Sequence, residues 1–116
     1  MDKILNQYSK EEDINQISKK IIESNIIKTT HFHERIIIRN IPELLVDETL
    51  PRIELIKLID KRQHKKDVGY DFYYYLSNTK NLKLCFIPST NKTLLINAIL
   101  IHRKWQSLIK SIKRRN

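Results

Sequence analysis

The chain has 116 residues, of which 41% are hydrophobic and 30% are charged, so we expect a single globular domain. Its one glycine and one cysteine exclude a glycine-rich phosphate loop, an internal disulfide and a metal site of paired cysteines. Lys and Arg number 22 against 13 Asp and Glu, and the resulting net charge of +9 points to an acidic partner.

The first element that the sequence predicts is a helix over residues 10–24. Ser9 and Glu12 have the spacing of a capping box, in which Ser9 is the N-cap and Glu12 reaches back to its backbone amide. Behind them, four residues recur at the intervals of one helical stripe: Ile14, Ile17, Ile21 and Ile22.

The next two predicted elements are a strand and a second helix. The β-branched content rises over residues 31–39, which predicts a strand that ends before Pro42 and carries His31 and His33 on its polar face. Thr49 and Pro51 signal the start of a helix, which is expected over residues 50–62. Its apolar stripe consists of Ile53, Ile56 and Ile59.

Residues 70–87 read as a β-hairpin whose two strands are joined by the five-residue loop 77–81. If Leu76 faces Leu82, one face is uniformly apolar, with the further pairs Tyr74/Leu84 and Phe72/Phe86. The opposite face then presents Tyr73, Tyr75 and Lys83.

The last predicted element is a long helix over residues 91–113. Apolar residues repeat there at intervals of four and three: Leu94, Ala98, Ile101, Trp105, Leu108 and Ile112. We expect the first half of this helix to be buried, Trp105 to belong to the core and His102 to be an interior or boundary residue.

The expected fold is therefore a single α+β domain over residues 1–116, in the order α-β-α-β-β-α, with a three-stranded sheet and a long C-terminal helix. The alternative is a winged helix, with helix 50–62 as the recognition helix and hairpin 70–87 as the wing.

Charge divides this domain into a neutral part and a basic part. Residues 1–71 hold all 13 acidic residues and 13 basic ones, whereas residues 72–116 hold nine basic residues and no acidic one. Because protein surfaces normally mix both signs, a carboxylate-free segment favours contact with a polyanion.

We therefore predict a non-enzymatic nucleic-acid-binding protein, with RNA favoured over DNA, which suits a small ribonucleoprotein component. Basic residues would contact phosphates, while aromatic residues beside a lysine on a sheet would stack unpaired bases. The predicted contact residues are Arg103, Lys104, Lys110, Lys113, Arg114, Arg115, Lys80, Lys83, Tyr73 and Tyr75, with Lys65 and Lys66 as a second patch.

Three alternatives stay open at this point. A protein-interaction or structural subunit within a larger assembly would dock through helix 10–24. A winged helix would bind DNA instead of RNA. A peripheral membrane protein would use the Trp and the basic residues of the last helix, although the apolar run 94–101 suits a core better and argues against a membrane partner.

The sequence predicts no catalytic residues, metal or cofactor. A metal-dependent nuclease needs clustered carboxylates, and none follows Asp71, while a Gly-x-Ser-x-Gly elbow is absent. His31 and His33 lack two further zinc ligands, for which only Asp71 and Cys85 are candidates. The single cysteine and the absence of an apolar signal core favour a soluble, intracellular protein of the cytoplasm or nucleus.

Overall fold

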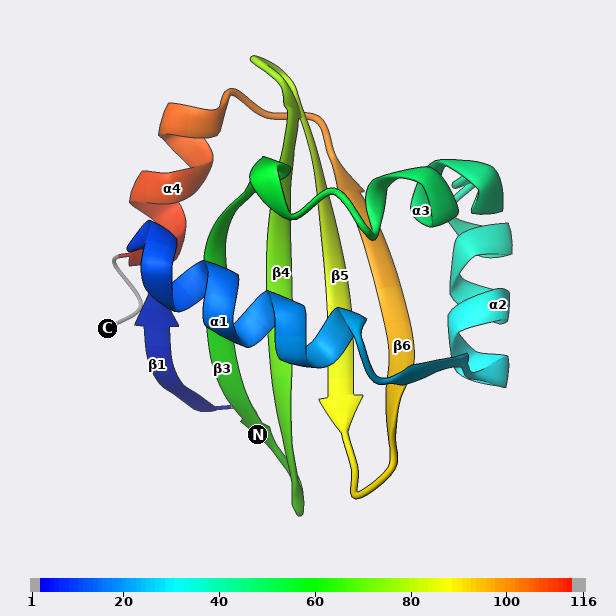
Figure 1. Ribbon diagram of the computed structural model, residues 1–116. Coiled ribbons are helices and arrows are strands. Elements are labelled where there is room, and N and C mark those ends of the chain that lie inside the picture. The colour runs from blue at the N-terminus through cyan, green and yellow to red at the C-terminus, as the bar shows by residue number, and fades with distance from the viewer. Residues whose placement is uncertain (1–2, 114–116) are drawn as a thin grey trace.

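A computed structural model describes residues 3–113 and shows one six-stranded sheet in the order β1-β3-β4-β5-β6-β2 (Figure 1). Neighbouring strands are antiparallel except for β2 and β6, which are parallel. The strands are β1 (Lys3–Tyr8), β2 (Asn25–Lys28), β3 (Ile56–His64), β4 (Asp67–Ser77), β5 (Lys80–Pro88) and β6 (Lys92–Ile101). The helices are α1 (Glu11–Ile22), α2 (Thr30–Ile38), α3 (Glu43–Thr49) and α4 (Trp105–Lys113), with a 3₁₀ turn η1 (Ile53–Leu55) before β3.

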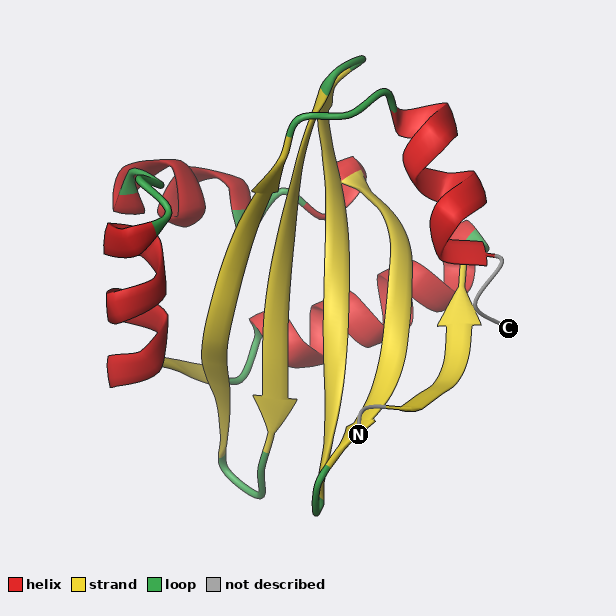
Figure 2. Ribbon diagram, turned by 180° about the vertical axis from the view of Figure 1, so that it is seen from behind, coloured by secondary structure: helices red, strands yellow, loops and turns green. Residues whose placement is uncertain are grey.

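Helices lie on both sides of this sheet. α1 crosses one face, and α4 lies near the β1 edge, as the two opposite views show (Figures 1 and 2). On the other face, α4 packs Leu108 and Ile112 into a cluster with Leu58 of β3 and Tyr73 of β4. α2 stands at the edge beside β6, where Arg39 at the end of the helix donates from Nη1 to the carbonyl of Ala98 at 3.0 Å. We call the two sides of the sheet the α1 face and the α4 face.

The main core fills the α1 face, and a smaller cluster fills part of the α4 face. α1 buries Ile14 and Ile21 against the sheet, and Phe32 and Ile36 of α2 join the same cluster. On the α4 face, the buried hydrophobic residues of the cluster are Leu58, Tyr73, Leu108 and Ile112. The small second cluster is what holds α4 against the sheet.

The α+β class is confirmed, but the predicted order and the three-stranded sheet are wrong, and so is the winged-helix alternative. Residues 31–39 form helix α2 instead of a strand. Thr29 caps this helix, because its side chain accepts from the amide of Phe32 at 3.1 Å. The four-residue spacing of Phe32 and Ile36 then places both of them in the core.

The predicted helix 50–62 is also wrong, because residues 56–64 form the central strand β3. A register shift between Ile56 and Leu58 is a β-bulge, which inserts one extra residue into the strand. Ile56 and Ile59 therefore both belong to the α1-face core although they are three residues apart. This spacing imitates the stripe of a helix.

The same error affects the predicted helix 91–113, of which only residues 105–113 are helical. Residues 92–101 form β6, with a register shift opposite Cys85 and Phe86. Leu95 and Ala98, which flank this irregularity, are both buried in the α1-face core. His102 follows the strand and is exposed, so its expected interior or boundary position is wrong.

Two local predictions agree better with the structure. The predicted helix 10–24 is α1, but its N-cap is Lys10 and no side chain caps it, so the capping box does not form. The hairpin exists and keeps the predicted faces, but its register differs by two residues, since Tyr74 pairs with Leu82 and Phe72 with Leu84. None of the described helices is both long and apolar enough to cross a membrane.

Candidate nucleic-acid interface

Two connections meet at one end of the sheet and are tied together there. The β4–β5 turn contains Asn78, whose carbonyl accepts from the amide of Trp105 at 3.2 Å. The side chain of Asn81, which is fully buried, donates from Nδ2 to the carbonyl of Arg103 at 3.1 Å. These bonds fix the segment between β6 and α4 beside the turn. We call the group Tyr75, Asn78, Lys80, Arg103, Lys104 and Trp105 the turn–helix site.

Two half-buried aromatic rings form the centre of the turn–helix site. The rings of Tyr75 and Trp105 meet edge to face, with centroids 6.2 Å apart and an interplanar angle of 86°. The Tyr75 hydroxyl donates to Oδ1 of Asn78, which fixes the orientation of its ring. Together with Lys104 and Gln106, these residues line a surface pocket of about 400 Å³.

Three exposed cations lie on the two connections that form this site, and one of them, Lys104, lines the pocket. Lys80 ends the β4–β5 turn, and Arg103 and Lys104 directly precede α4. Within residues 3–113, none of the three forms an ion pair with a carboxylate. The N-terminus of α4, whose first turn has no acidic residue, adds a partial positive charge at the same end.

Tyr73 and Lys83, also predicted to contact nucleic acid, lie inside the molecule on the α4 face. Tyr73 is only 2% exposed beneath α4, and its hydroxyl donates to Oδ2 of Asp60 at 3.4 Å. The Lys83 ammonium lies 5.4 Å from the centroid of the Tyr73 ring and 3.6 Å from Oδ2 of Asp71. Their contacts are therefore internal.

A buried ionic network that the sequence did not reveal extends from these two residues. Asp60 of β3 and Asp71 of β4 are direct partners in the sheet and are 0% and 4% exposed. Nε and Nη2 of Arg62 each lie 2.7 Å from Oδ2 of Asp71, and Nε2 of Gln7 donates to Oδ1 of Asp60 at 2.7 Å. The sequence predicted a helix over residues 50–62, so it did not predict that Asp60 and Asp71 pair across two neighbouring strands.

The surroundings of this network shift several pKa values. Burial raises the pKa of Asp60 and the neighbouring charge of Asp71 adds to this, although the hydrogen bond from Gln7 opposes it. Burial opposes the charge of Arg62, but the neighbouring Asp71 carboxylate holds the pKa of Arg62 above its usual value. The pKa of the Cys85 thiol is raised by burial and by the charge of Asp71, which disfavours a nucleophilic thiolate.

The remaining predicted contact residues lie apart from the turn–helix site or outside the described residues. Lys110 is exposed on α4, and Lys113 is the last residue of that helix. Arg114 and Arg115 lie outside the described residues. Lys65 and Lys66 are exposed in the β3–β4 turn, which is at the other end of β4.

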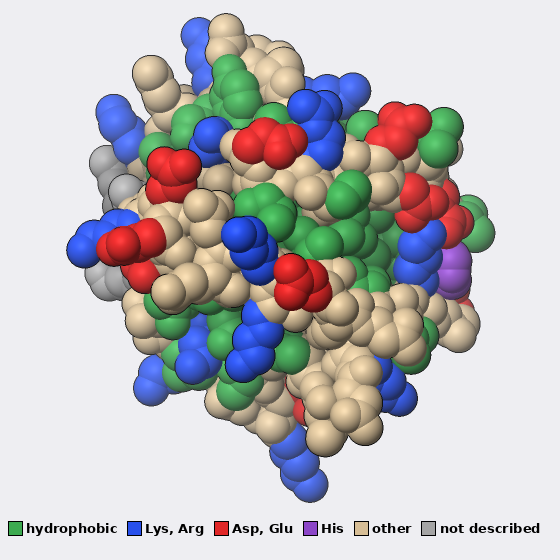
Figure 3. Space-filling model, in the orientation of Figure 1, with side chains coloured by type: hydrophobic (Ala, Val, Ile, Leu, Met, Phe, Trp, Pro, Cys, Tyr) green, Lys and Arg blue, Asp and Glu red, His purple; other side chains and the backbone are tan. Residues whose placement is uncertain are grey.

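The surface of the α1 face has mixed charge. Figure 3 shows acidic and basic side chains intermixed over the α1 face, as expected for the neutral N-terminal part of the chain. On α1, the predicted docking helix, no large apolar side chain is exposed; the strongly exposed aliphatic residues are Ile37 and Ile38 of α2 and Leu44 of α3.

The two histidines considered for metal binding have other neighbours. They lie two residues apart on α2, where His31 accepts from Nε of Arg35 at 3.3 Å and His33 lies 3.7 Å from Oε1 of Glu43. Among residues 3–113, no group of three or more His, Cys, Asp or Glu side chains is arranged to hold a metal ion.

Comparisons with protein-family models, with curated proteins and with solved structures find no match for this chain.

Proposed function

We propose that the chain is a non-enzymatic module that binds single-stranded nucleic acid, with RNA as the favoured form, through the turn–helix site. The observation that carries the proposal is the meeting of two half-buried aromatic rings with three exposed cations that have no carboxylate partner among the described residues. These residues come from two parts of the chain, the β4–β5 hairpin and the segment from the end of β6 to the start of α4.

The chemistry of the site suits a flexible strand better than a duplex. A base that is already unpaired can lie against an aromatic ring, and stacking of this kind contributes about 1–3 kcal/mol per base. Lys80, Arg103 and Lys104 would then meet the phosphates on either side, which gives affinity without reading the sequence. Such a small basic module suits a ribonucleoprotein component.

The proposal is tested by the affinity for a fluorescently labelled U12 strand at low salt. Tyr75→Leu removes a ring of the turn–helix site, and Tyr8→Leu removes a half-buried ring on β1 as the matched control. We expect Tyr75→Leu to weaken binding about fivefold or more and Tyr8→Leu to leave it unchanged.

Thermal melting of both variants separates a loss of binding from a loss of folding. Trp105 supplies a second readout, because a base stacked on the indole quenches its fluorescence. A folded Tyr75→Leu variant that binds U12 normally, or a wild-type chain that prefers a 12-base-pair duplex to U12, overturns the proposal.

A further inference from the structure

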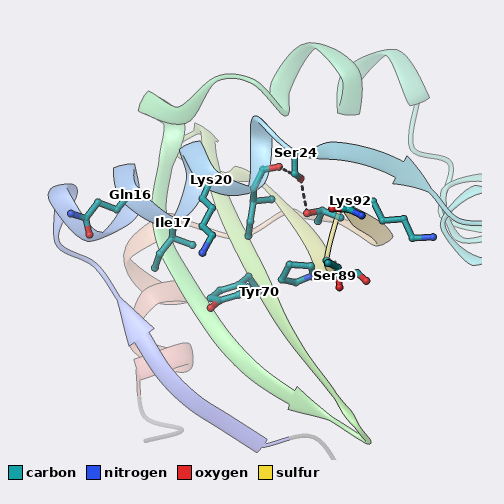
Figure 4. A pocket seen from close by; sticks show the side chains of 12 residues that line it. Gln16, Ile17, Lys20, Ser24, Tyr70, Ser89 and Lys92 are labelled. Carbon is teal, nitrogen blue, oxygen red and sulfur yellow. Dashed lines mark hydrogen bonds between the residues drawn. The ribbon is translucent and has the colours of Figure 1, made fainter.

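A second pocket lies on the α1 face, between the C-terminal half of α1 and the β5–β6 turn (Figure 4). Its volume is about 470 Å³, within the range of roughly 300–1,000 Å³ typical of small-molecule sites. β5 runs from Lys80 of the turn–helix site to Pro88 of this pocket, so the two sites lie at opposite ends of the same strand. The inference is therefore independent of the proposed function.

The walls of this pocket are apolar and include one aromatic ring. Ile17 and Ile21 of α1 form one wall, and Tyr70 of β4 and Pro88 of β5 form the other. Tyr70 is half-buried and packs against the main core, so its ring has a fixed position. A flat wall of this kind suits a planar ring, which can stack on Tyr70 or on the ring of Pro88.

The polar groups in the floor of the pocket are already satisfied by each other. The hydroxyls of Ser24 and Thr93 are hydrogen-bonded at 2.7 Å, and Thr93 is 1% exposed. The carbonyl of Ile21 accepts from the amide of Ser24 at 3.2 Å and from its hydroxyl at 2.6 Å. The polar groups of the floor are therefore hydrogen-bonded without a ligand. The carbonyl of Ile21, near the end of α1, is also hydrogen-bonded.

The rim of the pocket carries positive charge without a compensating carboxylate. Its lining includes Lys20 and Lys92 and no Asp or Glu, and neither lysine forms an ion pair within residues 3–113. Figure 4 shows the Lys20 side chain extending from α1 toward Tyr70, whereas Lys92 points outward. Lys20 is thus the group placed to meet an anion above the aromatic wall.

We propose that this pocket binds a small anionic ligand with a planar ring, about the size of a mononucleotide. The ring would lie between Ile17 and Tyr70, and the anionic group would meet the ammonium of Lys20 at the rim. Ser89 and Thr90, which are exposed in the β5–β6 turn, supply further hydroxyl groups at the same rim.

The test uses three probes that separate the ring from the charge: adenosine 5′-monophosphate, adenosine and ribose 5-phosphate. Binding is followed by NMR through the backbone amides of Tyr70 and Ser89, with the Trp105 indole as the reporter for the turn–helix site. We expect the monophosphate to shift the pocket amides and to bind at least threefold tighter than either fragment. Equal binding of one fragment, or shifts confined to Trp105, overturns the proposal.

Lys20→Gln and Lys19→Gln form the matched pair of variants, since both lysines are exposed on α1 but only Lys20 lines the pocket. We expect Lys20→Gln to weaken binding of the monophosphate about three- to fivefold, as the loss of one exposed charge contact does, and Lys19→Gln to have no effect. Equal effects of the two variants contradict the assignment of the anion to Lys20 and thereby the proposal.

Discussion

Asp71 is the residue on which the charge balance inside the α4 face depends. Arg62 and Lys83 both approach the same oxygen, Oδ2 of Asp71, and their side chains are only 18% and 15% exposed. Removal of this carboxylate would take away the negative charge that two poorly solvated cations share, and breaking a fully buried pair costs about 3–5 kcal/mol.

We therefore expect Asp71→Asn to lower the free energy of unfolding by about 2–4 kcal/mol, measured by urea denaturation at pH 7. This expected loss of stability is slightly below that for a fully buried pair because the two cations keep some contact with water. Glu54→Gln is the control, since Glu54 pairs with Arg52 on the open surface and its loss should leave the midpoint unchanged. If neither Asp71→Asn nor Glu54→Gln moves the midpoint of urea denaturation, the structural role of the network is contradicted.

The raised pKa of Asp60 predicts a pH dependence with a definite sign. The folded chain holds the Asp60 proton more tightly than the unfolded chain, whose aspartates titrate near pH 3.9. The contribution of Asp60 to stability therefore falls as the pH rises from about 3.9 to the raised value, and it is constant above that value.

The variant Asp60→Asn, which cannot ionise, should not show this decline. We expect its stability relative to the wild type to improve between pH 3.5 and pH 7 in a series of urea denaturations. Asp71, Arg62 and Lys83, the other charges near Asp60, are present in both proteins. A difference that stays constant, or that shifts in favour of the wild type, would show that Asp60 ionises normally.

At the scale of elements, α4 is attached to the sheet by very few residues. Among its residues 105–112, Leu108 and Ile112 are the buried side chains, and they form one cluster with Leu58 and Tyr73 of the strands below. Trp105, which the sequence placed in the core, is only half-buried at the start of the helix. The loss of one buried leucine should therefore have a large effect on this helix.

We expect Leu108→Ala to destabilise the fold by about 2–3 kcal/mol, at the lower end of the range for buried leucines because the cluster around it is small. Lys110→Ala, on the exposed side of the same helix, should change the stability by less than about 0.5 kcal/mol. Chemical denaturation followed by Trp105 fluorescence measures both changes. Similar stabilities of the two variants would show that α4 is not anchored at Leu108.

The β-bulges explain why the sequence pattern predicts helices where the structure has strands β3 and β6. A regular strand places every second residue on one face, but the bulges in β3 and β6 give core residues a three-residue spacing, as in Ile56 and Ile59 or in Leu95 and Ala98. In β6 the apolar run 94–101 is also interrupted only by Asn97. Nothing in the local pattern then distinguishes β3 and β6 from buried helices.

The alternation of side chains along the strands did identify the two faces of the hairpin, because a register error of two residues leaves each side chain on its own face. It could not reveal that α4 covers Tyr73 and leaves Tyr75 half-exposed, since that depends on contacts between residues 30 or more positions apart. The sequence predicted four residues of the turn–helix site as contact residues, namely Tyr75, Lys80, Arg103 and Lys104. It did not predict that they lie together.

At the scale of the whole molecule, basic residues occupy both ends of β4, which are roughly 30 Å apart for a strand of this length. Lys80 and Lys104 lie near one end, and Lys65 and Lys66 lie in the turn at the other. Of these four lysines, only Lys104 lines the pocket that Tyr75 and Trp105 share. The salt dependence of binding can decide which end meets a nucleic acid strand.

We expect the double change Lys80→Gln and Lys104→Gln to make the slope of log K against log salt shallower by about 1.4 for U12, from about 0.7 per phosphate contact. The double change Lys65→Gln and Lys66→Gln removes the same charge and should leave the slope unchanged. Titrations at four salt concentrations measure both slopes. Equal changes would show that the strand is not held by the turn–helix site alone.

The positions of β1 and β2 at opposite edges of the sheet also constrain how the chain can fold. β1 needs β3 as its neighbour, and β2 needs residues 92–95 of β6. During synthesis from the N-terminus, β1 therefore waits for residues 59–63, and β2 waits for residues 92–95. Because pairings between segments far apart in the sequence are slow to form, we expect the β2 edge of the sheet to close late in folding.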